Sequence, residues 1–413
     1  MAWDVFDLYA GIGGLGMGFE RAGFTSKGAV DVWDKAIEAN ARLFDHTTAV
    51  ATVMDADSII LESGWEAENG ILVGGPPCQG FSYANQSRGA EKRESTSAVN
   101  YKSAEELRSE VGTFCAKIRA LRPTAFVMEN VGGVIKRTSH AMREAGGILE
   151  HEMPGYHVEC RYLNASEYGI PQHRNRAVFI GVQDSLIDDP SDWNPWPERT
   201  HFDFAKKVRS VNARIGLKEE GSDAKKDAKA YKEEYLQGSN LDNDITELLP
   251  AVTVRDAIGD LPKLEAGQSS KIPNHDAGQI QERVRRCLEL IPPGGNIRDV
   301  YDQDPSRLND SVRGKLDDPN SLGRSVWYLY KRMNWAASPG PAIPCEIRAG
   351  NGYAHPTQHR AITVREAARL QTFDDDVVLT GTKSDQYRLI GNAVPPKLSE
   401  VMAKSLLKSL NEL

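Results

Sequence analysis

The chain has 413 residues, of which 40% are hydrophobic and 26% charged, and its formal net charge is −8. This is the composition of a globular protein that is long enough for two domains, and it excludes a disordered or fibrous chain. No apolar run approaches the length that crosses a bilayer, so we expect no membrane partner and a cytoplasmic location. The acidic balance argues mildly against nonspecific binding of nucleic acid, but a basic cleft can lie on an acidic body.

The first half of the chain alternates strand-like and helix-like segments, which is typical of a parallel α/β sheet. Helical periodicity and a closing glycine at position 23 predict the first helix, and an i, i+3, i+4 pattern predicts the longest one. We expect strands at 4–9, 28–32, 71–73, 125–128 and 176–182, and helices at 15–22, 34–43 and 104–121.

The rest of the chain lacks this regular alternation of strands and helices. Residues 82–103 are polar without apolar periodicity, which favours a lid, and residues 205–237 are dense in Lys, Glu and Asp, which favours a solvated helical insertion. Apolar helical patterns return at 363–373 and at 398–410. We therefore expect a catalytic domain at 1–183, completed by 375–413, and a second, smaller domain at 184–374.

The five cysteines are scattered, with no CxxC pair and no histidine spacing suited to zinc, so we expect neither a metal site nor disulfides. Four of them are interpreted as small buried hydrophobic residues: Cys115, Cys160, Cys287 and Cys345. Cys78 differs, because it follows the strand at 71–73 in the sequence GPPCQGFS, where two prolines restrict the backbone. It is a candidate nucleophile, and the alternative is a tight loop that carries a buried thiol.

Residues 7–16, DLYAGIGGLG, contain the spacing GxGxxG, and an acidic residue, Asp31, follows twenty residues after Gly11. This pattern predicts a tight turn where a nucleoside approaches the backbone while the acid holds ribose hydroxyls. NAD and S-adenosylmethionine fit these requirements equally well. On this motif alone, a nicotinamide-dependent dehydrogenase remains an alternative.

Two further blocks carry charged residues that suit work on a base. Glu129 follows the buried strand at 125–128, at the sheet edge where α/β proteins bind ligands, and could share a proton with a base. Arg174 and Arg176 are two residues apart, so on a strand they point to one face and favour an anionic partner. The alternatives are a surface ion pair for Glu129 and arginines that bond loop carbonyl groups.

Together with MENV at 128–131, QHRNR at 172–176 and QYRLIGNAVPP at 386–396, these blocks resemble, in order and spacing, the DNA (cytosine-5) methyltransferases. The resemblance covers nearly all of 3–183 and about 345–400. It implies a Rossmann-like, S-adenosylmethionine-dependent methyltransferase fold and methyl transfer to carbon 5 of a cytosine flipped out of double-stranded DNA. The resemblance makes Cys78 the nucleophile at carbon 6, with Glu129, Arg174 and Arg176 as the other catalytic residues.

The same resemblance implies which residues bind S-adenosylmethionine. Trp33 is an alternative to Val32 beside the adenine, and the register at Asp57 is uncertain by a turn because Asp55 is close. The implied cofactor-binding residues are Tyr9, Gly11, Ile12, Gly13, Gly14, Asp31, Val32, Asp57, Ser58, Pro77, Asn392 and Ala393.

We expect a monomer that modifies DNA, with a cognate restriction endonuclease as a possible separate partner and with residues 184–374 reading the DNA sequence. An RNA cytosine methyltransferase and a catalytically inactive DNA-binding regulator are alternatives. The intact Cys78 and Glu129 argue against the inactive regulator, and the position of the nucleophile after Pro77 argues against the RNA enzymes. The sequence departs from the family at Ala342-Ile343-Pro344, where many relatives have Thr-Ile-Thr.

Overall fold

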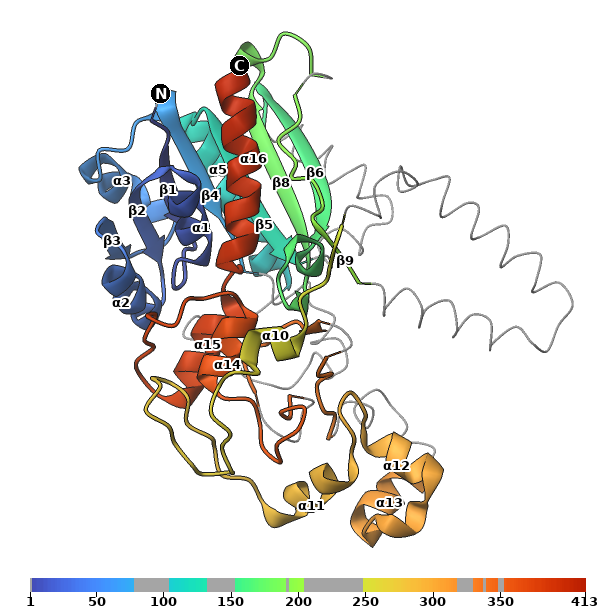
Figure 1. The fold of residues 1–413 in the computed structure, drawn as a ribbon. Coiled ribbons are helices and arrows are strands. Elements are labelled where there is room, and N and C mark those ends of the chain that lie inside the picture. Colours follow the sequence, from blue (N-terminus) through green and yellow to red (C-terminus); the bar gives the residue numbers. More distant parts are fainter. Residues whose placement is uncertain are drawn as a thin grey trace, which may run out of the picture.

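The computed structural model describes residues 2–77, 104–131, 153–190, 193–203, 248–317, 330–336, 339–347 and 353–413. Its centre is a seven-stranded sheet with the strand order β3-β2-β1-β4-β5-β8-β6 (Figure 1). The strands are β1 (Asp4–Leu8), β2 (Thr25–Asp31), β3 (Thr47–Val50), β4 (Gly70–Gly74), β5 (Ala125–Val131), β6 (Tyr156–Asn164) and β8 (Asn175–Gln183).

Strands β3, β2, β1, β4 and β5 run parallel, and β8 pairs antiparallel with both β5 and β6. The α/β class and the mostly parallel sheet are as predicted. Because the chain leaves β1 toward β2 on one side and later returns to β4 on the other, the strand order reverses between β1 and β4. Open α/β sheets bind ligands beyond the carboxyl ends of the strands at such a switch point.

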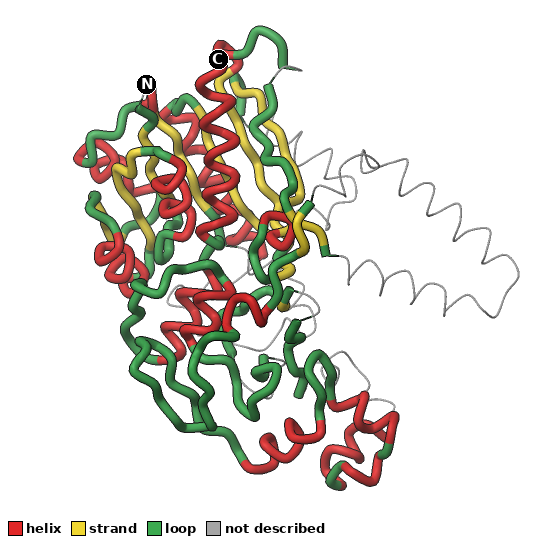
Figure 2. The backbone as a smooth tube through the Cα atoms, viewed as in Figure 1, coloured by secondary structure: helices red, strands yellow, loops and turns green. Residues whose placement is uncertain are grey.

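Successive side chains along the strands point to opposite faces of the sheet and form a hydrophobic layer on each face. Val5, Ile71 and Val127 pack on one face with helices α1 (Gly14–Ala22) and α16 (Pro396–Glu412). Phe6 and Phe126 pack on the other face with α3 (Asp57–Glu62) and α5 (Ala104–Leu121). Figure 1 shows α16 lying across the sheet, and Figure 2 shows the strands between helices on both faces. A parallel sheet covered on both faces buries its central strands, as β1 and β4 are here.

Most predicted elements of the first half are present, with bounds shifted by one to three residues. Helix α1 ends at Gly23, whose φ of 103° is the left-handed conformation of a C-terminal cap, and α2 spans Asp34–Leu43 as expected. Strands β3 and β6 were not predicted. Both lie at the edges of the sheet, and the polar residues on the solvated face of β6 interrupt its apolar pattern.

The part that follows β8 contains short helices that pack in two cores, one of them shared with the first part of the chain. Helices α10 (Val254–Ile258), α14 (Val364–Leu370) and α15 (Lys383–Asn392) share a core that also contains Ile12 and Trp33 from the first part of the chain. A separate core joins the remaining helices, α11 (Glu282–Leu290), α12 (Ile297–Gln303) and α13 (Asp310–Asp317). The predicted lid at 82–103 and the predicted insertion at 205–237 lie outside the described residues.

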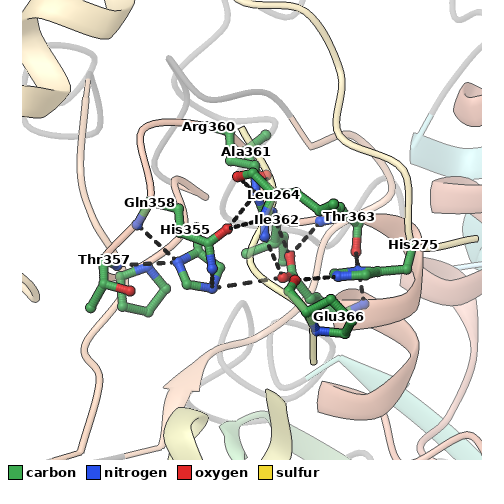
Figure 3. Close-up of polar contacts among 12 residues, drawn as sticks. Leu264, His275, His355, Thr357, Gln358, Arg360, Ala361, Ile362, Thr363 and Glu366 are labelled. Carbon is green, nitrogen blue, oxygen red and sulfur yellow. Dashed lines mark hydrogen bonds and ion pairs between the residues drawn. The ribbon is translucent and has the colours of Figure 1, made fainter. Parts of the chain in front are cut away.

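A buried polar network organises the start of α14 (Figure 3). Glu366 accepts a bidentate pair of hydrogen bonds from Arg360, at 2.7 and 2.8 Å, and a third from the backbone N–H of Thr363. His275 bonds the Thr363 hydroxyl at 2.9 Å, and His355 lies 3.6 Å from the Glu366 carboxylate. Helix α14 buries Ala367, Ala368 and Leu370, as its apolar pattern predicts, and it also buries Arg365 and Glu366. No helix among the described residues is long and apolar enough to cross a membrane.

Candidate active site

The glycine loop after β1 forms the first wall of the site. Tyr9 and Gly11 both have φ of 58°, a conformation that costs strain in a residue with a side chain, such as Tyr9. The backbone N–H of Gly11 donates to Asp31 at the end of β2, over 2.9 Å. The other oxygen of Asp31 accepts from the N–H of Trp33, also over 2.9 Å. Asp31 therefore fixes the glycine loop to the end of β2.

Two carboxylates beneath this loop have altered acidity. Burial raises the pKa of Asp31, while hydrogen bonds from Trp33, Gly11 and Val32 and the charge of Arg388 oppose the rise. Burial raises the pKa of Asp7 to about 8, against a hydrogen bond from the Gly16 N–H. Burial thus disfavours the charged form of both carboxylates. Because little water reaches this wall, a ligand group that donates hydrogen bonds to a carboxylate here would compete with few water molecules.

Open space for a ligand lies over the same loop. A β-carbon added at Gly11 would meet no atom within 4 Å, and Val32 is 37% exposed. Trp33, the alternative residue beside an adenine, is buried, and the Arg388 guanidinium lies 4.3 Å from its ring centroid. Of the two residues, Val32 offers the accessible surface. The residues present therefore fit a nucleoside cofactor over the glycine loop.

The C-terminal block packs against the glycine loop. A β-carbon at Gly14 would overlap the carbonyl oxygen of Val394, so the two segments touch through their backbones. Asn392 is exposed, and its side chain accepts a hydrogen bond from the Cys345 thiol at 2.7 Å. Residues from both ends of the chain therefore meet beside the open space at Gly11.

The second wall is the loop that leads from β4 to Cys78. Cys78 itself lies outside the described residues, whereas Gly75, Pro76 and Pro77 are described. A β-carbon at Gly75 would lie 3.4 Å from the carboxylate of Glu129, and the Asn130 side chain donates to the carbonyl of Pro76 at 3.2 Å. The backbone that enters Cys78 is therefore held against β5 at Glu129 and Asn130.

Glu129 and Arg176 form a close pair at this wall. The Nε atom of Arg176 lies 2.5 Å from Oε1 of Glu129, and the two side chains are 13% and 11% exposed. The pair follows from the register of the antiparallel strands β5 and β8. Arg176 lies opposite Val131, and Glu129 is two residues before Val131, so Glu129 and Arg176 lie on the same face of the sheet. Strand β5 runs two residues past Glu129, so the carboxylate projects from the strand rather than from a loop.

Arg174 has different surroundings from Arg176. The predicted strand is interrupted at Arg174, which lies between β7 (Gln172–His173) and β8. The alternation of a continuous strand therefore does not apply across this position. The Arg174 side chain is buried and donates to three backbone carbonyl groups, those of Ile343, Gly391 and Ala393.

Other predicted site residues have clear partners. The Tyr9 hydroxyl donates to the Glu110 carboxylate at 2.8 Å. Asp57 begins α3 and pairs with Lys117 of α5 at 2.5 Å, and the neighbouring Ser58 is exposed. Ile12, Gly13, Gly14 and Ala393 are buried around the loop, and Pro77 is half-buried.

Sequence reasoning missed two residues of the site. Arg388 stacks on Trp33 near Asp31, and a basic residue in the block 386–396 could have been its signal. The prediction that Cys345 is a buried hydrophobic residue is wrong, because Cys345 is exposed and bonds Asn392. Cys115 and Cys287 are buried as expected, and Cys160 is half-buried. Among the described residues, no group of three His, Cys, Asp or Glu side chains could hold a metal ion.

Comparison with known proteins identifies the family. The model of the C-5 cytosine-specific DNA methylases matches residues 3–408, which is nearly the whole chain. The chain belongs to this family. It is thus a DNA (cytosine-5) methyltransferase, and the dehydrogenase and regulator alternatives are set aside.

Curated relatives of this methylase include bacterial and plant enzymes. It is 28% identical to the type II methyltransferase M1.HphI of Haemophilus parahaemolyticus, over 99% of this chain and 87% of that protein. It is 29% identical to the type II methyltransferase M.NgoFVII of Neisseria gonorrhoeae, over 98% and 86%. DNA (cytosine-5)-methyltransferase 3 of Arabidopsis thaliana is 26% identical over 98% of this chain, but this chain covers only 30% of that protein.

Solved structures support the fold of the methylase. A DNA modification methyltransferase encoded within a prophage of E. coli matches with a TM-score of 0.58 and 24% identity, over 99% of this chain and 100% of that chain. The Dnmt2 methyltransferase of S. pombe matches with a TM-score of 0.52 and 15% identity, over 99% of each chain. At these identities the structures support the fold alone.

Proposed function

We propose that this methylase recognises a specific sequence in duplex DNA, flips a cytosine out of the stack and methylates its carbon 5 with S-adenosylmethionine as the donor. The observation that carries the proposal is the Glu129–Arg176 pair, which lies against the backbone entering Cys78. This pair lies at the same edge of the sheet as the glycine loop held by Asp31. A nucleophile, an acid and a nucleoside site at one edge are what cytosine methylation requires.

The glycine loop and the C-terminal block would hold the cofactor, which supplies an electrophilic methyl group. Asp31 would accept hydrogen bonds from ribose hydroxyls, because its carboxylate already fixes the Gly11 N–H and retains free lone pairs. Val32 would lie beside the adenine, on its exposed surface. The other residues that we assign to this site are Tyr9, Gly11, Ile12, Gly13, Gly14, Asp57, Ser58, Pro77, Asn392 and Ala393.

Cys78 would activate the cytosine ring. Its thiolate forms a bond to carbon 6, and the electron pair of the C5–C6 double bond moves toward carbon 5 and the ring nitrogen. Glu129 donates or shares a proton at ring nitrogen 3, and Arg176 holds the Glu129 carboxylate in place. After substitution at carbon 5, loss of the carbon-5 proton to a base and departure of the thiolate restore the aromatic ring.

The relatives that carry type II names favour a role in a restriction–modification system. We propose that the methylase acts as a cytoplasmic monomer whose cognate endonuclease, where one exists, is a separate protein. Residues 184–374 would form the domain that reads the DNA sequence. Bisulfite sequencing of DNA from cells that express the chain should show one methylated sequence motif, and methylation scattered over all cytosines would contradict sequence specificity.

The first experiment incubates the protein with labelled S-adenosylmethionine and with duplex DNA, RNA or no nucleic acid. We expect label in DNA only, and we expect Cys78→Ser to abolish it because serine is a far weaker nucleophile. Cys160→Ser is the matched control: burial raises the pKa of the Cys160 thiol to about 12, so it remains an inert thiol and its loss should leave methylation unchanged. Label in RNA alone would favour an RNA methyltransferase.

A second experiment tests the covalent step. DNA that contains 5-fluorocytosine should trap a covalent complex through Cys78, because fluorine cannot leave carbon 5 as a proton does. The complex should be absent for Cys78→Ser and present for Cys160→Ser. Methylation of ordinary DNA without any trapped complex would rule out the addition mechanism.

A further inference from the structure

The motif Gln172-x-Arg174-x-Arg176 divides into two groups with different partners. Arg176 pairs with Glu129, whereas the side chains of Gln172 and Arg174 are buried among the backbone groups of distant segments. The interruption of the strand at Arg174 permits this division. The Arg174 carbonyl accepts from the N–H of Ala165, while β7 pairs with β11 (Gly340–Pro341) instead of continuing into the central sheet.

Arg174 joins two segments that are far apart in sequence. Its Nη1 donates to the Ile343 carbonyl at 3.2 Å, and its Nη2 donates to the carbonyls of Gly391 and Ala393 at 3.2 and 2.9 Å. The side chain is only 3% exposed. A guanidinium group offers donors in a fixed planar fork, so one Arg can hold two segments at a set spacing where a Lys ammonium cannot.

Glutamines extend the same set of bonds. Gln172 donates to the Leu370 carbonyl at 2.7 Å and to the Gln371 side chain at 2.6 Å, and it accepts from the Ile343 N–H. Gln371 then donates to the carbonyls of Ile390 and Ala393, at 2.7 and 3.1 Å. All of these bonds are buried, where an unsatisfied partner is costly. Residues 390–393 are therefore fixed from two directions.

Residues 391–394 are also packed closely on both sides. A β-carbon at Gly391 would overlap the backbone of Pro344, and one at Gly14 would overlap the carbonyl of Val394. Between these contacts, the exposed side chain of Asn392 accepts a hydrogen bond from the Cys345 thiol. The exposed Asn392 therefore lies beside the glycine loop, in a segment (residues 391–394) that is packed closely on both sides.

We propose that Arg174 is a positioning residue that sets residues 391–393 for cofactor binding and does not contact the cytosine. The inference rests on the proposed function, because it assigns Asn392 and Ala393 to the cofactor site. Arg174 acts through the backbone of the C-terminal block, whereas Arg176 acts at Glu129. The two arginines of one motif therefore affect different kinetic constants.

Arg174→Lys should separate the two roles. Lysine keeps the positive charge but cannot bond three carbonyls in the Arg geometry, so the block loosens. We expect the dissociation constant for S-adenosylmethionine, measured by calorimetry without DNA, to rise about tenfold, while kcat at saturating cofactor stays within about threefold of wild type. Arg176→Lys should do the reverse, lowering kcat with little change in cofactor affinity.

Arg365→Lys is the matched control. Arg365 is also fully buried and also donates to three backbone carbonyls, those of Pro273, Asp374 and Val377, but none of them belongs to the C-terminal block. Arg365→Lys should lower thermal stability as much as Arg174→Lys and leave cofactor affinity unchanged. If Arg174→Lys and Arg365→Lys lost affinity for S-adenosylmethionine equally, the role of Arg174 would be general stability of the fold, and the inference would be overturned.

A milder pair of variants tests the same block if Arg174→Lys does not fold. Cys345 is exposed, so Cys345→Ala should fold while removing the donor to Asn392, and cofactor affinity should fall about threefold. Cys345→Ser retains a donor and should restore affinity. Unchanged affinity in Cys345→Ala would overturn the inference alone, whereas a wild-type protein that binds no S-adenosylmethionine would overturn the proposed function as well.

Discussion

The side chain of Glu129 is 11% exposed and pairs with the Arg176 guanidinium. A charged acid in such a place needs that partner, because an unpaired buried charge is strongly unfavourable. In the proposed reaction, the ring nitrogen of the cytosine would compete with Arg176 for the carboxyl group of Glu129. At the scale of the residue, we therefore expect the chemistry to depend on this ion pair.

Glu129→Gln tests this dependence. Glutamine has nearly the same shape but cannot give up a proton, so we expect kcat to fall by about 10²- to 10⁴-fold with the fold intact. Single-turnover methylation and circular dichroism would measure the two effects. Glu159→Gln on β6 is the control: Glu159 also lies within 4 Å of an arginine, Arg161, but belongs to the far edge strand, and its loss should leave kcat unchanged. A Glu129→Gln variant with more than a tenth of wild-type kcat would contradict the role.

At the scale of the element, helix α14 begins beside three buried ionisable side chains, those of His355, Arg360 and Glu366 (Figure 3). Burial lowers the pKa of His355 to about 4, so the ring is neutral at pH 7. Burial pushes the pKa of Glu366 upward, but hydrogen bonds and charge from Arg360 outweigh this and leave it lowered. Because the folded state resists protonation at both groups, acid should loosen this helix before it affects the apolar sheet.

The pH dependence of stability follows from His355. An unfolded His has a pKa near 6.5, so between pH 6.5 and about 4 the unfolded chain binds more protons than the folded one. The free energy of unfolding should therefore fall as the pH is lowered through this window. Glu366 adds to the loss below pH 4.5, because its lowered pKa stabilises the folded state only above that value.

His355→Gln should remove this part of the titration. Between pH 7 and pH 5, we expect the loss of unfolding free energy to be smaller in the variant than in wild type by about 1–2 kcal/mol, measured by urea unfolding at each pH. The variant is expected to be less stable than wild type at pH 7, because it loses the hydrogen bonds that the imidazole accepts from the backbone N–H groups of Thr357 and Gln358. Parallel pH profiles of the two proteins would show that His355 does not titrate in this window.

The sequence predicted the strands of the sheet best where apolar residues are contiguous. Strand β4 is buried along its length, and β5 begins with the buried apolar run Ala125–Met128. Edge strand β6 and the network around Glu366 were missed, because solvated faces and buried charges break such patterns. The separate surroundings of Arg174 and Arg176 could not be foreseen, since they depend on a break in the strand and on carbonyls more than a hundred residues away.

At the scale of the whole molecule, the two ends of the chain lie together (Figure 1). The Trp3 indole donates to the Asn411 side chain at 3.1 Å, and α16 packs on α1 so closely that a β-carbon at Gly18 would overlap Ser399. Five residues of α16 complete the core on this face of the sheet: Leu398, Met402, Ala403, Leu406 and Leu410. The last helix therefore covers this face of the central sheet.

A circular permutant tests this arrangement. Joining the ends with a short Gly/Ser linker and opening the chain at Gly64, an exposed turn where a β-carbon would meet no atom within 4 Å, should give a folded methylase. We expect cofactor affinity and kcat within about threefold of wild type. A truncation after Ala393 is the contrasting variant and should not fold, because it removes the buried face of α16. Loss of folding in the permutant but not in the truncation would contradict the structural role of α16.

The contact between Gly14 and Val394 also has a consequence for how the protein is made. The ribosome releases Gly14 near the start of synthesis and Val394 only hundreds of residues later, so this contact can form only after nearly the whole chain has been made. If the proposed cofactor site lies at this contact, an interrupted translation product should bind S-adenosylmethionine more weakly than the full chain does.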